Sequence, residues 1–219
     1  MPTPKTLDQL VSNLRRHGRP LATFHKGDRV FGATGMSLRS RYSYVLEAAP
    51  GDLPADFRPD YSPGEMLTMG VFEGKYLNDC TREFPAEWFY GALAAGRLSP
   101  EGPNPADCNF FGIGSRQPLS IWNQNGWAPS KERRGKTDDR YRGMLGDPAN
   151  NPDERGWFQW YCRYWMGRRL PAIDDIQIKR WRAFRRHAGA IRANCKPGDL
   201  SCRPRERQAL LQWAYNPFI

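Results

Sequence analysis

Residues 156–166 read GWFQWYCRYWM, and this stretch decides the fold class. In a helix of this sequence, apolar and aromatic side chains occur on almost every side, so little polar surface is left to face water. Such a helix is stable only when other elements cover it. The stretch therefore predicts a buried helix around which a helical core packs.

A second, longer helical pattern follows it. Residues 173–194 place acidic residues in the first turn, basic residues on the outside, and an apolar stripe on the remaining face. Residues 203–215 predict a last helix that closes the chain. The apolar stripe of the long helix consists of Ile173, Ile176, Trp181, Phe184, Ala188 and Ile191.

The first half of the chain predicts a smaller and more mixed structure. Residues 20–48 combine hairpin signals with alternating Tyr42, Tyr44 and Leu46, which is typical of a small β region. The stretch from 128 to 155 is rich in Pro, Gly, Asp and Asn and predicts a mobile loop without regular structure. Short helices with Ser, Pro or Gly at their ends are predicted over residues 62–70, 85–96 and 118–124.

These patterns together predict a mainly α (α+β) fold. Its helical, bundle-like core comes from the C-terminal half, and a small β element lies near the N-terminus. We expect a single domain over residues 1–219, with a β/α part at 20–115 and a basic, Trp-rich helical part at 116–219.

Composition excludes several classes of protein. No apolar run reaches the roughly 18 residues of a membrane span, and the first residues lack the apolar run of a signal peptide. We therefore expect a soluble cytoplasmic, nucleoid or nuclear protein with no membrane partner. The five cysteines are odd in number and irregularly spaced, which favours a reducing compartment over a disulfide framework.

One group of residues resembles a zinc site. His187, Cys195 and Cys202 could supply three ligands, but the chain has no C-x-x-C pair. The segment CKPGDLSC, residues 195–202, also suits a turn between two helices. No metal site is predicted there.

The positive charge is concentrated in the second half. Residues 1–110 contain 12 Lys and Arg against 13 Asp and Glu, whereas residues 111–219 contain 21 against 10, a net charge of +11. Seven of the eight Trp also lie in the second half, and Arg outnumbers Lys 26 to 7 in the whole chain. A GC-rich genome would explain the Arg excess but not its concentration in one half.

This concentration indicates nucleic-acid binding. Arg grips phosphate oxygens with a planar pair of donors, and bases stack on aromatic rings. Most of the Trp side chains are expected in the core, but the arginines cannot all be buried. Residues 131–142, KERRGKTDDRYR, are the best candidate for a segment that orders on a nucleic acid. The predicted nucleic-acid-binding residues are Arg133, Arg134, Lys136, Arg140, Arg142, Arg163, Arg168, Arg169, Lys179, Arg182 and Arg186.

Common catalytic motifs are absent, and one short pattern remains. The Gly135-Lys136-Thr137 triplet has Ser130 where a phosphate-binding loop needs Gly. Pro59-Asp60 followed by Glu73-Gly74-Lys75 fits the loose pattern of Mg²⁺-dependent nucleases, in which two carboxylates hold the metal and the Lys steadies the phosphate. That pattern requires the second acid and the Lys on a central strand, whereas residues 71–80 suit a strand or a tight turn.

Lys75 has a second possible role. If Phe72, Tyr76 and Trp88 exclude water from it, the free amine is favoured and can attack a sugar carbon, as in glycosylases that also nick the strand. Asp79 would lie nearby. The alternative is a surface Lys paired with Asp79 or Glu83. The candidate catalytic residues are Lys75, Tyr76, Asp79 and Glu73.

Two blocks of the chain carry a resemblance. Residues 70–89, GVFEGKYLNDCTREFPAEWF, and residues 155–187 resemble an uncharacterised family found in bacteria, viruses and some eukaryotes. With the tail CRPRERQALLQWAY, they cover about a third of the chain. The resemblance implies no activity. It implies a small residue at the position of Glu73 in relatives, which favours Lys75 over the nuclease pattern.

These observations predict a protein that binds DNA and acts on it, with base excision or base modification as the best fit. The alternatives are a Mg²⁺-dependent nuclease, a DNA- or RNA-binding module without catalysis, and a protein whose basic face binds an acidic protein partner. No cofactor is expected except Mg²⁺ in the nuclease alternative.

Overall fold

The computed structural model describes residues 3–33, 42–101, 105–131 and 140–219. Within these residues the architecture is mainly α with one two-stranded antiparallel sheet, so the predicted fold class is confirmed. In order along the chain, the elements are α1 Leu7–His17, η1 Leu21–Thr23, β1 Arg29–Phe31, β2 Ser43–Val45, α2 Pro63–Met69, η2 Phe72–Gly74, α3 Ala86–Ala94, η3 Pro105–Cys108, α4 Leu119–Gln124, α5 Arg140–Gly146, α6 Trp157–Trp165, α7 Pro171–Phe184, α8 Arg186–Asn194 and α9 Pro204–Gln212, where η marks a 3₁₀ turn.

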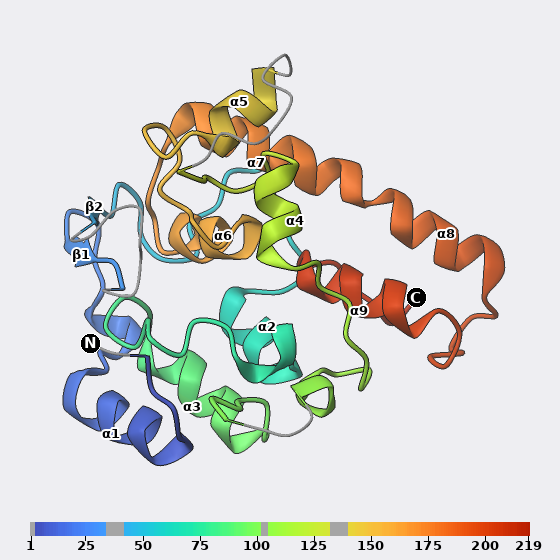
Figure 1. The fold of residues 1–219 in the computed structure, drawn as a ribbon, viewed down its shortest axis with the longest axis horizontal. Helices are drawn as coiled ribbons and strands as arrows, with labels where there is room; N and C mark the ends of the chain where they lie inside the picture. Colours follow the sequence, from blue (N-terminus) through green and yellow to red (C-terminus); the bar gives the residue numbers. More distant parts are fainter. Residues whose placement is uncertain (1–2, 34–41, 102–104, 132–139) are drawn as a thin grey trace.

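Helix α6 forms the centre of the core, as its sequence predicts. It contacts α2 on one side and α7 on another (Figure 1). Trp160 and Tyr161 are fully buried. Phe57, from the loop before α2, places its ring 4.8–5.8 Å from the rings of Trp160, Tyr161, Tyr164 and Trp181. Aromatic residues from both halves of the chain thus form the interior that α6 requires.

Local signals at the ends of helices account for several elements. Ser62 and Glu65 form a reciprocal capping box at the start of α2, with Pro63 as the first helical residue. The predicted helices at 85–96 and 118–124 are observed as α3 and α4. In the sheet, Val30 pairs with Tyr44, and both side chains point into the core.

The structure differs from the expectations at two helices. The predicted helix over 173–194 is divided into α7 and α8 at Arg185, where the bond from Ala188 N–H to Arg185 O tightens the turn. Its outer part buries Ala188 and Ile191 against Leu210 of α9, in a small separate cluster. The stretch 128–155, expected to lack regular structure, contains α5.

Two other differences concern α1 and the cysteines. Helix α1 was not expected, although Thr6 caps it and Leu10 and Leu14 are buried. Cys195 and Cys202 form a disulfide across the turn between α8 and α9, a single local bridge that the cysteine pattern did not indicate. The sequence suggested a turn here, and that turn brings the two Cα atoms within 5.8 Å. A disulfide is uncommon in the reducing compartment that the cysteine count favours.

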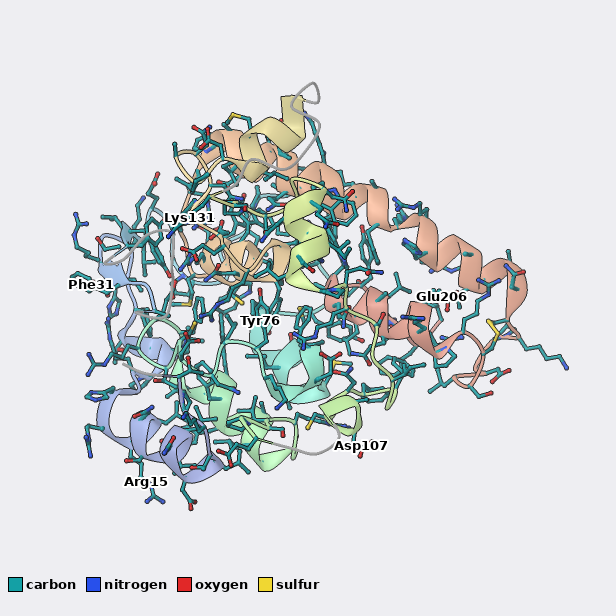
Figure 2. The ribbon with its side chains drawn as sticks, viewed as in Figure 1. Arg15, Phe31, Tyr76, Asp107, Lys131 and Glu206 are labelled. Carbon is teal, nitrogen blue, oxygen red and sulfur yellow. A yellow bond between two sulfur atoms is a disulfide. The ribbon has the colours of Figure 1, made fainter. Side chains whose placement is uncertain are left out.

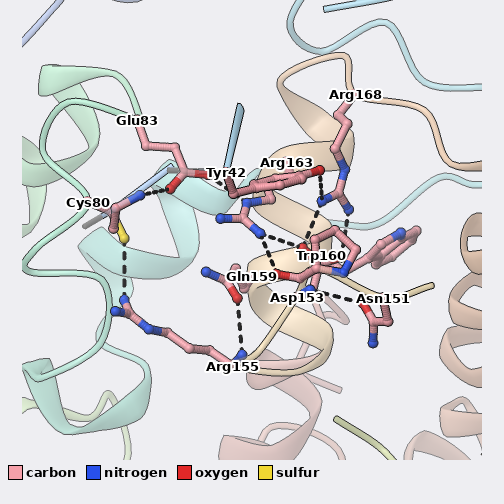
Figure 3. A network of polar contacts seen from close by, with 12 residues as sticks. Tyr42, Cys80, Glu83, Asn151, Asp153, Arg155, Gln159, Trp160, Arg163 and Arg168 are labelled. Carbon is pink, nitrogen blue, oxygen red and sulfur yellow. Dashed lines mark hydrogen bonds and ion pairs between the residues drawn. The ribbon is translucent and has the colours of Figure 1, made fainter. Parts of the chain in front are cut away.

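Four buried charged side chains tie α6 to the rest of the fold (Figure 3). Arg163 of α6 donates from Nε to Glu83 at 2.6 Å and from Nη1 to Asp153 at 2.9 Å. Arg168 grips both oxygens of Asp153, at 2.8 and 2.6 Å. The remaining Glu83 oxygen accepts from the backbone N–H of Ala33 at 3.0 Å. Every carboxylate oxygen of this network therefore has a donor.

The network holds Asp153 in its charged form. Burial alone would raise the pKa of Asp153, but Arg168 and Arg163 hold that pKa below its ordinary value of 3.8. Removing one member of such a group leaves a charge buried without a partner, which costs about 3–5 kcal/mol.

Among the described residues, no helix has the length and apolar character needed to cross a bilayer.

We predict that Asp153→Asn lowers the free energy of unfolding by about 3–5 kcal/mol at pH 7, because Arg168 and Arg163 lose their shared anion. Urea denaturation measures the change. Since Asp153 has a lowered pKa in the folded protein, the difference between variant and native chain shrinks as the pH falls below about 4. The control is Asp175→Asn, which removes an exposed ion pair with Lys179 and costs about 0–1 kcal/mol. Equal effects of the two variants would contradict the role of the network.

Candidate functional site

The turn that holds Lys75 has an unusual backbone. Phe72 and Glu73 both have φ of 54°, in the left-handed region that costs a residue other than Gly about 1–3 kcal/mol. Gly74 has φ of 67°, and a Cβ there would lie 2.7 Å from Ser99 N. Only glycine fits that position. Of the two predicted alternatives, a strand or a tight turn, the structure shows the tight turn. This turn fixes the direction in which the Lys75 side chain leaves the backbone.

Glu73 holds this turn in place. Its carboxylate pairs with Arg116 and accepts from Asn109 Nδ2 at 3.2 Å, while its own N–H donates to Asn109 Oδ1 at 2.8 Å. Asp60 is occupied elsewhere, since it accepts from Asn216 N at 2.7 Å. The nuclease pattern required a central strand and two carboxylates on one metal. The structure provides a 3₁₀ turn and two carboxylates with separate partners, so it gives the nuclease pattern no support.

A cavity of about 670 Å³ opens beside the turn. Its walls come from the turn after α2, the segment before α4, and helices α4, α6, α7, α8 and α9. Tyr76, one of the lining residues, lies toward the middle of the molecule (Figure 2). Half-buried rings form much of the wall: Phe72, Tyr76, Trp122, Trp127, Phe184 and Trp213.

Positive charge predominates in the lining. Of the described residues around the cavity, one carboxylate, Asp79, accompanies five basic side chains. These are Lys75, Arg116, Arg155, Arg180 and Arg186.

Asp79 and Arg155 form a tight pair in the cavity wall. Arg155 donates to both carboxylate oxygens, at 2.7 and 2.5 Å. Burial alone would raise the pKa of Asp79, but Arg155 lowers it below the ordinary value. Tyr76 donates its hydroxyl to the Arg155 carbonyl, and burial raises its pKa. Asp79 and Tyr76 therefore both bind Arg155 and hold this part of the cavity wall together.

Lys75 faces the cavity without a carboxylate partner. Its Nζ lies 3.5 Å from Pro100 O, and it forms no ion pair within the described part of the chain. The alternative of a Lys paired with Asp79 or Glu83 is thus wrong, because Arg155 and Arg163 hold those carboxylates.

Trp88, expected beside Lys75, is instead a core residue. Its ring lies 5.4 Å from those of Phe84 and Trp165, and it does not line the cavity.

Arg180, Trp122 and Trp213 form a packed group in the cavity wall. The Arg180 guanidinium lies 5.4 Å from the rings of Trp122 and Trp213 and donates to Gln177 Oε1 at 2.7 Å. A Cβ on Gly156, at the start of α6, would lie 2.9 Å from the Trp122 ring. The glycine lets α4 approach α6 and places Trp122 in the wall.

His187 adds a titratable ring to the same wall. Its ring centre lies 4.3 Å from that of Phe184. Burial, together with the charge of Arg186, lowers the pKa of His187 below 6.5, so the ring is neutral at pH 7. A zinc site at His187 would need Cys195 and Cys202 as ligands, but their sulfur atoms are bonded to each other in the disulfide. The described part of the chain contains no group of three or more His, Cys, Asp or Glu able to hold a metal ion.

The predicted phosphate-binding residues are distributed over different environments. Arg163 and Arg168 are buried in the ionic network, so their assignment is wrong: neither has surface to offer a phosphate. Arg169 donates to the backbone carbonyls of Tyr164 and Asp52.

The exposed members lie on α7 and α8. Lys179 pairs with Asp175, and Arg182 pairs with Asp56. Arg186 lines the cavity. Arg133, Arg134 and Lys136 lie outside the described residues, as do the side chains of Arg140 and Arg142.

Several lining residues were not among the predicted site residues. Arg155 and Arg180 belong to the basic, Trp-rich run, and that pattern was the available signal for them. Arg116 and Gln212 carried no such signal, because the contacts that place them come from distant segments. Comparison of the chain with protein-family models, curated proteins and solved structures found no match.

Proposed function

We propose that this protein binds a nucleic-acid strand, DNA in the first instance, and takes one base into the cavity. The observation that carries the proposal is the combination of aromatic walls with five basic lining residues around one space. A base needs flat apolar faces, and the phosphates on either side of it need cations. A nucleotide within a strand presents both a flat base and flanking phosphates.

The dimensions and energies are suitable. A volume of about 670 Å³ lies within the usual range for pockets that enclose small ligands. Taking a base out of its stack costs a few kcal/mol, and stacking on protein aromatics contributes about 1–3 kcal/mol per base. Charge contacts to the flanking phosphates supply further binding free energy.

The charge of the whole second half supports a strand over a free nucleotide. Residues 111–219 have a net charge of +11, far more than one nucleotide requires. An acidic protein partner would use the same charge, but it would not need a cavity with aromatic walls. Such a role places the protein where nucleic acids occur, in the cytoplasm, nucleoid or nucleus.

The position of Lys75 in the cavity lining, without a carboxylate partner among the described residues, supports a chemical role at the same site. The free amine would attack C1′ of the sugar, forming a C–N bond as the bond from C1′ to the base breaks. Opening of the sugar ring at O4′ then gives an imine to Lys75. Of the three protons on the starting ammonium, one ends on the departing base, one on O4′ and one on the imine nitrogen, so charge and atoms balance.

We predict that Arg186→Glu weakens binding to a labelled single-stranded DNA by about tenfold and flattens the dependence of affinity on salt. Fluorescence anisotropy at several salt concentrations measures both, with RNA and duplex DNA in parallel. The control is Arg192→Glu, which makes the same charge change on α8 at an exposed residue outside the cavity lining. If both variants lose affinity equally, phosphates do not bind at the cavity.

We predict that borohydride traps a covalent adduct between native protein and DNA carrying damaged bases or an abasic site, because it reduces the imine to a stable amine. Lys75→Arg should abolish the adduct and keep binding, since Arg retains the charge but forms no such imine. EDTA should leave the adduct unchanged. Binding without an adduct in the native protein would leave a binding module, and cutting that requires Mg²⁺ would contradict the lyase chemistry.

A further inference from the structure

The small β-sheet carries the most exposed large apolar side chain among the described residues. Phe31 of β1 is 63% exposed and lies at the periphery of the molecule (Figure 2). Exposed strand edges usually carry charged residues or proline, which oppose pairing with another chain. An exposed phenylalanine has the opposite effect, so this edge favours a partner.

The backbone of β1 leaves the same edge open. Directly after the strand, Gly32 N donates to Tyr42 O at 2.8 Å, and the antiparallel ladder alternates along β1 from that pair. The N–H and C=O groups of Arg29 and Phe31 therefore point away from β2. No described segment forms a backbone hydrogen bond with them. They are free to pair with a further strand.

A basic pocket of about 330 Å³ lies beside β1 and includes no residue of β2. No carboxylate lines it. The lining residues are His17, Arg19, Arg29, Val30, Phe31 and Arg82.

Two of the three arginines in this pocket have no carboxylate partner within the described chain. Arg29 donates from Nη1 to a serine hydroxyl of β2 at 3.1 Å. Arg82 Nη2 contacts the two ring nitrogens of His17, at 3.0 and 2.9 Å. Arg19, by contrast, pairs with Asp28 at 3.5 Å. An acidic partner could therefore pair with Arg29 and Arg82 without breaking an ion pair of the protein.

We infer that this edge binds an extended acidic segment of another protein, which adds a third strand beside β1. The free N–H and C=O groups of Arg29 and Phe31 bind the main chain of such a segment, and its side chains give specificity. Residues two apart in a strand share a face. The segment therefore places an apolar residue beside Phe31 and an acidic residue, two positions away, beside Arg29.

The charge of the edge favours an acidic segment over two other occupants. A second copy of this chain, paired edge to edge, would bring two Arg29 side chains to one interface, where like charges oppose pairing. A nucleic-acid strand would satisfy the charge but has no alternating N–H and C=O groups to extend the sheet. No residue lines both this pocket and the larger cavity, so the inference is independent of the proposed function.

The test uses a labelled peptide with a central valine and two glutamates on each side, so that it fits β1 in either direction. Two matched peptides serve as controls: one has lysine in place of glutamate, and the other is N-methylated along its backbone, which keeps the charge but removes the donors. Fluorescence anisotropy at low salt should show that the native protein binds the first peptide about tenfold or more tightly than either control.

Two further measurements locate the bound peptide. Hydrogen exchange of the native protein should slow at the amides of Arg29 and Phe31 when the peptide is added, because both become hydrogen-bonded. Arg29→Glu should weaken peptide binding about tenfold, whereas Arg192→Glu, the same charge change on α8 outside this pocket, should leave it unchanged. Arg29 is exposed, so Arg29→Glu should unfold at the native midpoint.

Several results would overturn the inference. Equal binding of the N-methylated peptide, or equal losses in Arg29→Glu and Arg192→Glu, would mean that charge alone attracts the peptide. Exchange at Arg29 and Phe31 that slows with oligo(dT) but not with the peptide would assign the edge to nucleic acid. A native dimer that dissociates in Phe31→Ser, without peptide binding, would assign it to a second copy of the chain.

Discussion

Asp153 is a fully buried carboxylate shared by two buried guanidinium groups, and the position of the cavity wall depends on it. Replacing a whole buried ionic group by apolar residues is often neutral, so its main contribution here is to position segments. Asp153 lies two residues before Arg155 and three before Gly156, where α6 begins. Fixing Asp153 against Arg163 and Arg168 thus sets the start of α6, the Arg155 pair with Asp79, and the place where Trp122 packs.

The second constraint is the strained turn at residues 72–77. Left-handed residues other than Gly persist only where their surroundings hold them. Here the Glu73 ion pair with Arg116 and the contacts of Asn109 do so. The turn directs Lys75 into a cavity that is also lined by the basic, Trp-rich half. Two features separated by about half the chain therefore meet at one site, one supplying an amine and the other aromatic faces and charge.

The sequence was sufficient to predict an element where the residues that stabilise it are close together along the chain. The Ser62 capping box and the apolar surface of α6 predicted their helices because the deciding residues lie within one or two turns. Counting charges along the sequence could not separate buried arginines from exposed ones. Arg163 is buried because it pairs with Glu83 and Asp153, which lie outside α6. The disulfide was missed for a similar reason: an odd cysteine count excludes full pairing but not one local bridge.

The central claim is that a base enters the cavity. The most direct measurement is photochemical cross-linking of a strand that carries one 8-azidoadenine, with the attached residues mapped by mass spectrometry. Cross-links are expected on lining residues, foremost Trp122, Phe184 and Trp213, and free AMP in excess should reduce them. Cross-links confined to residues outside the lining, such as the exposed Lys179 and Arg192, would show that the strand binds on the surface and leaves the cavity empty.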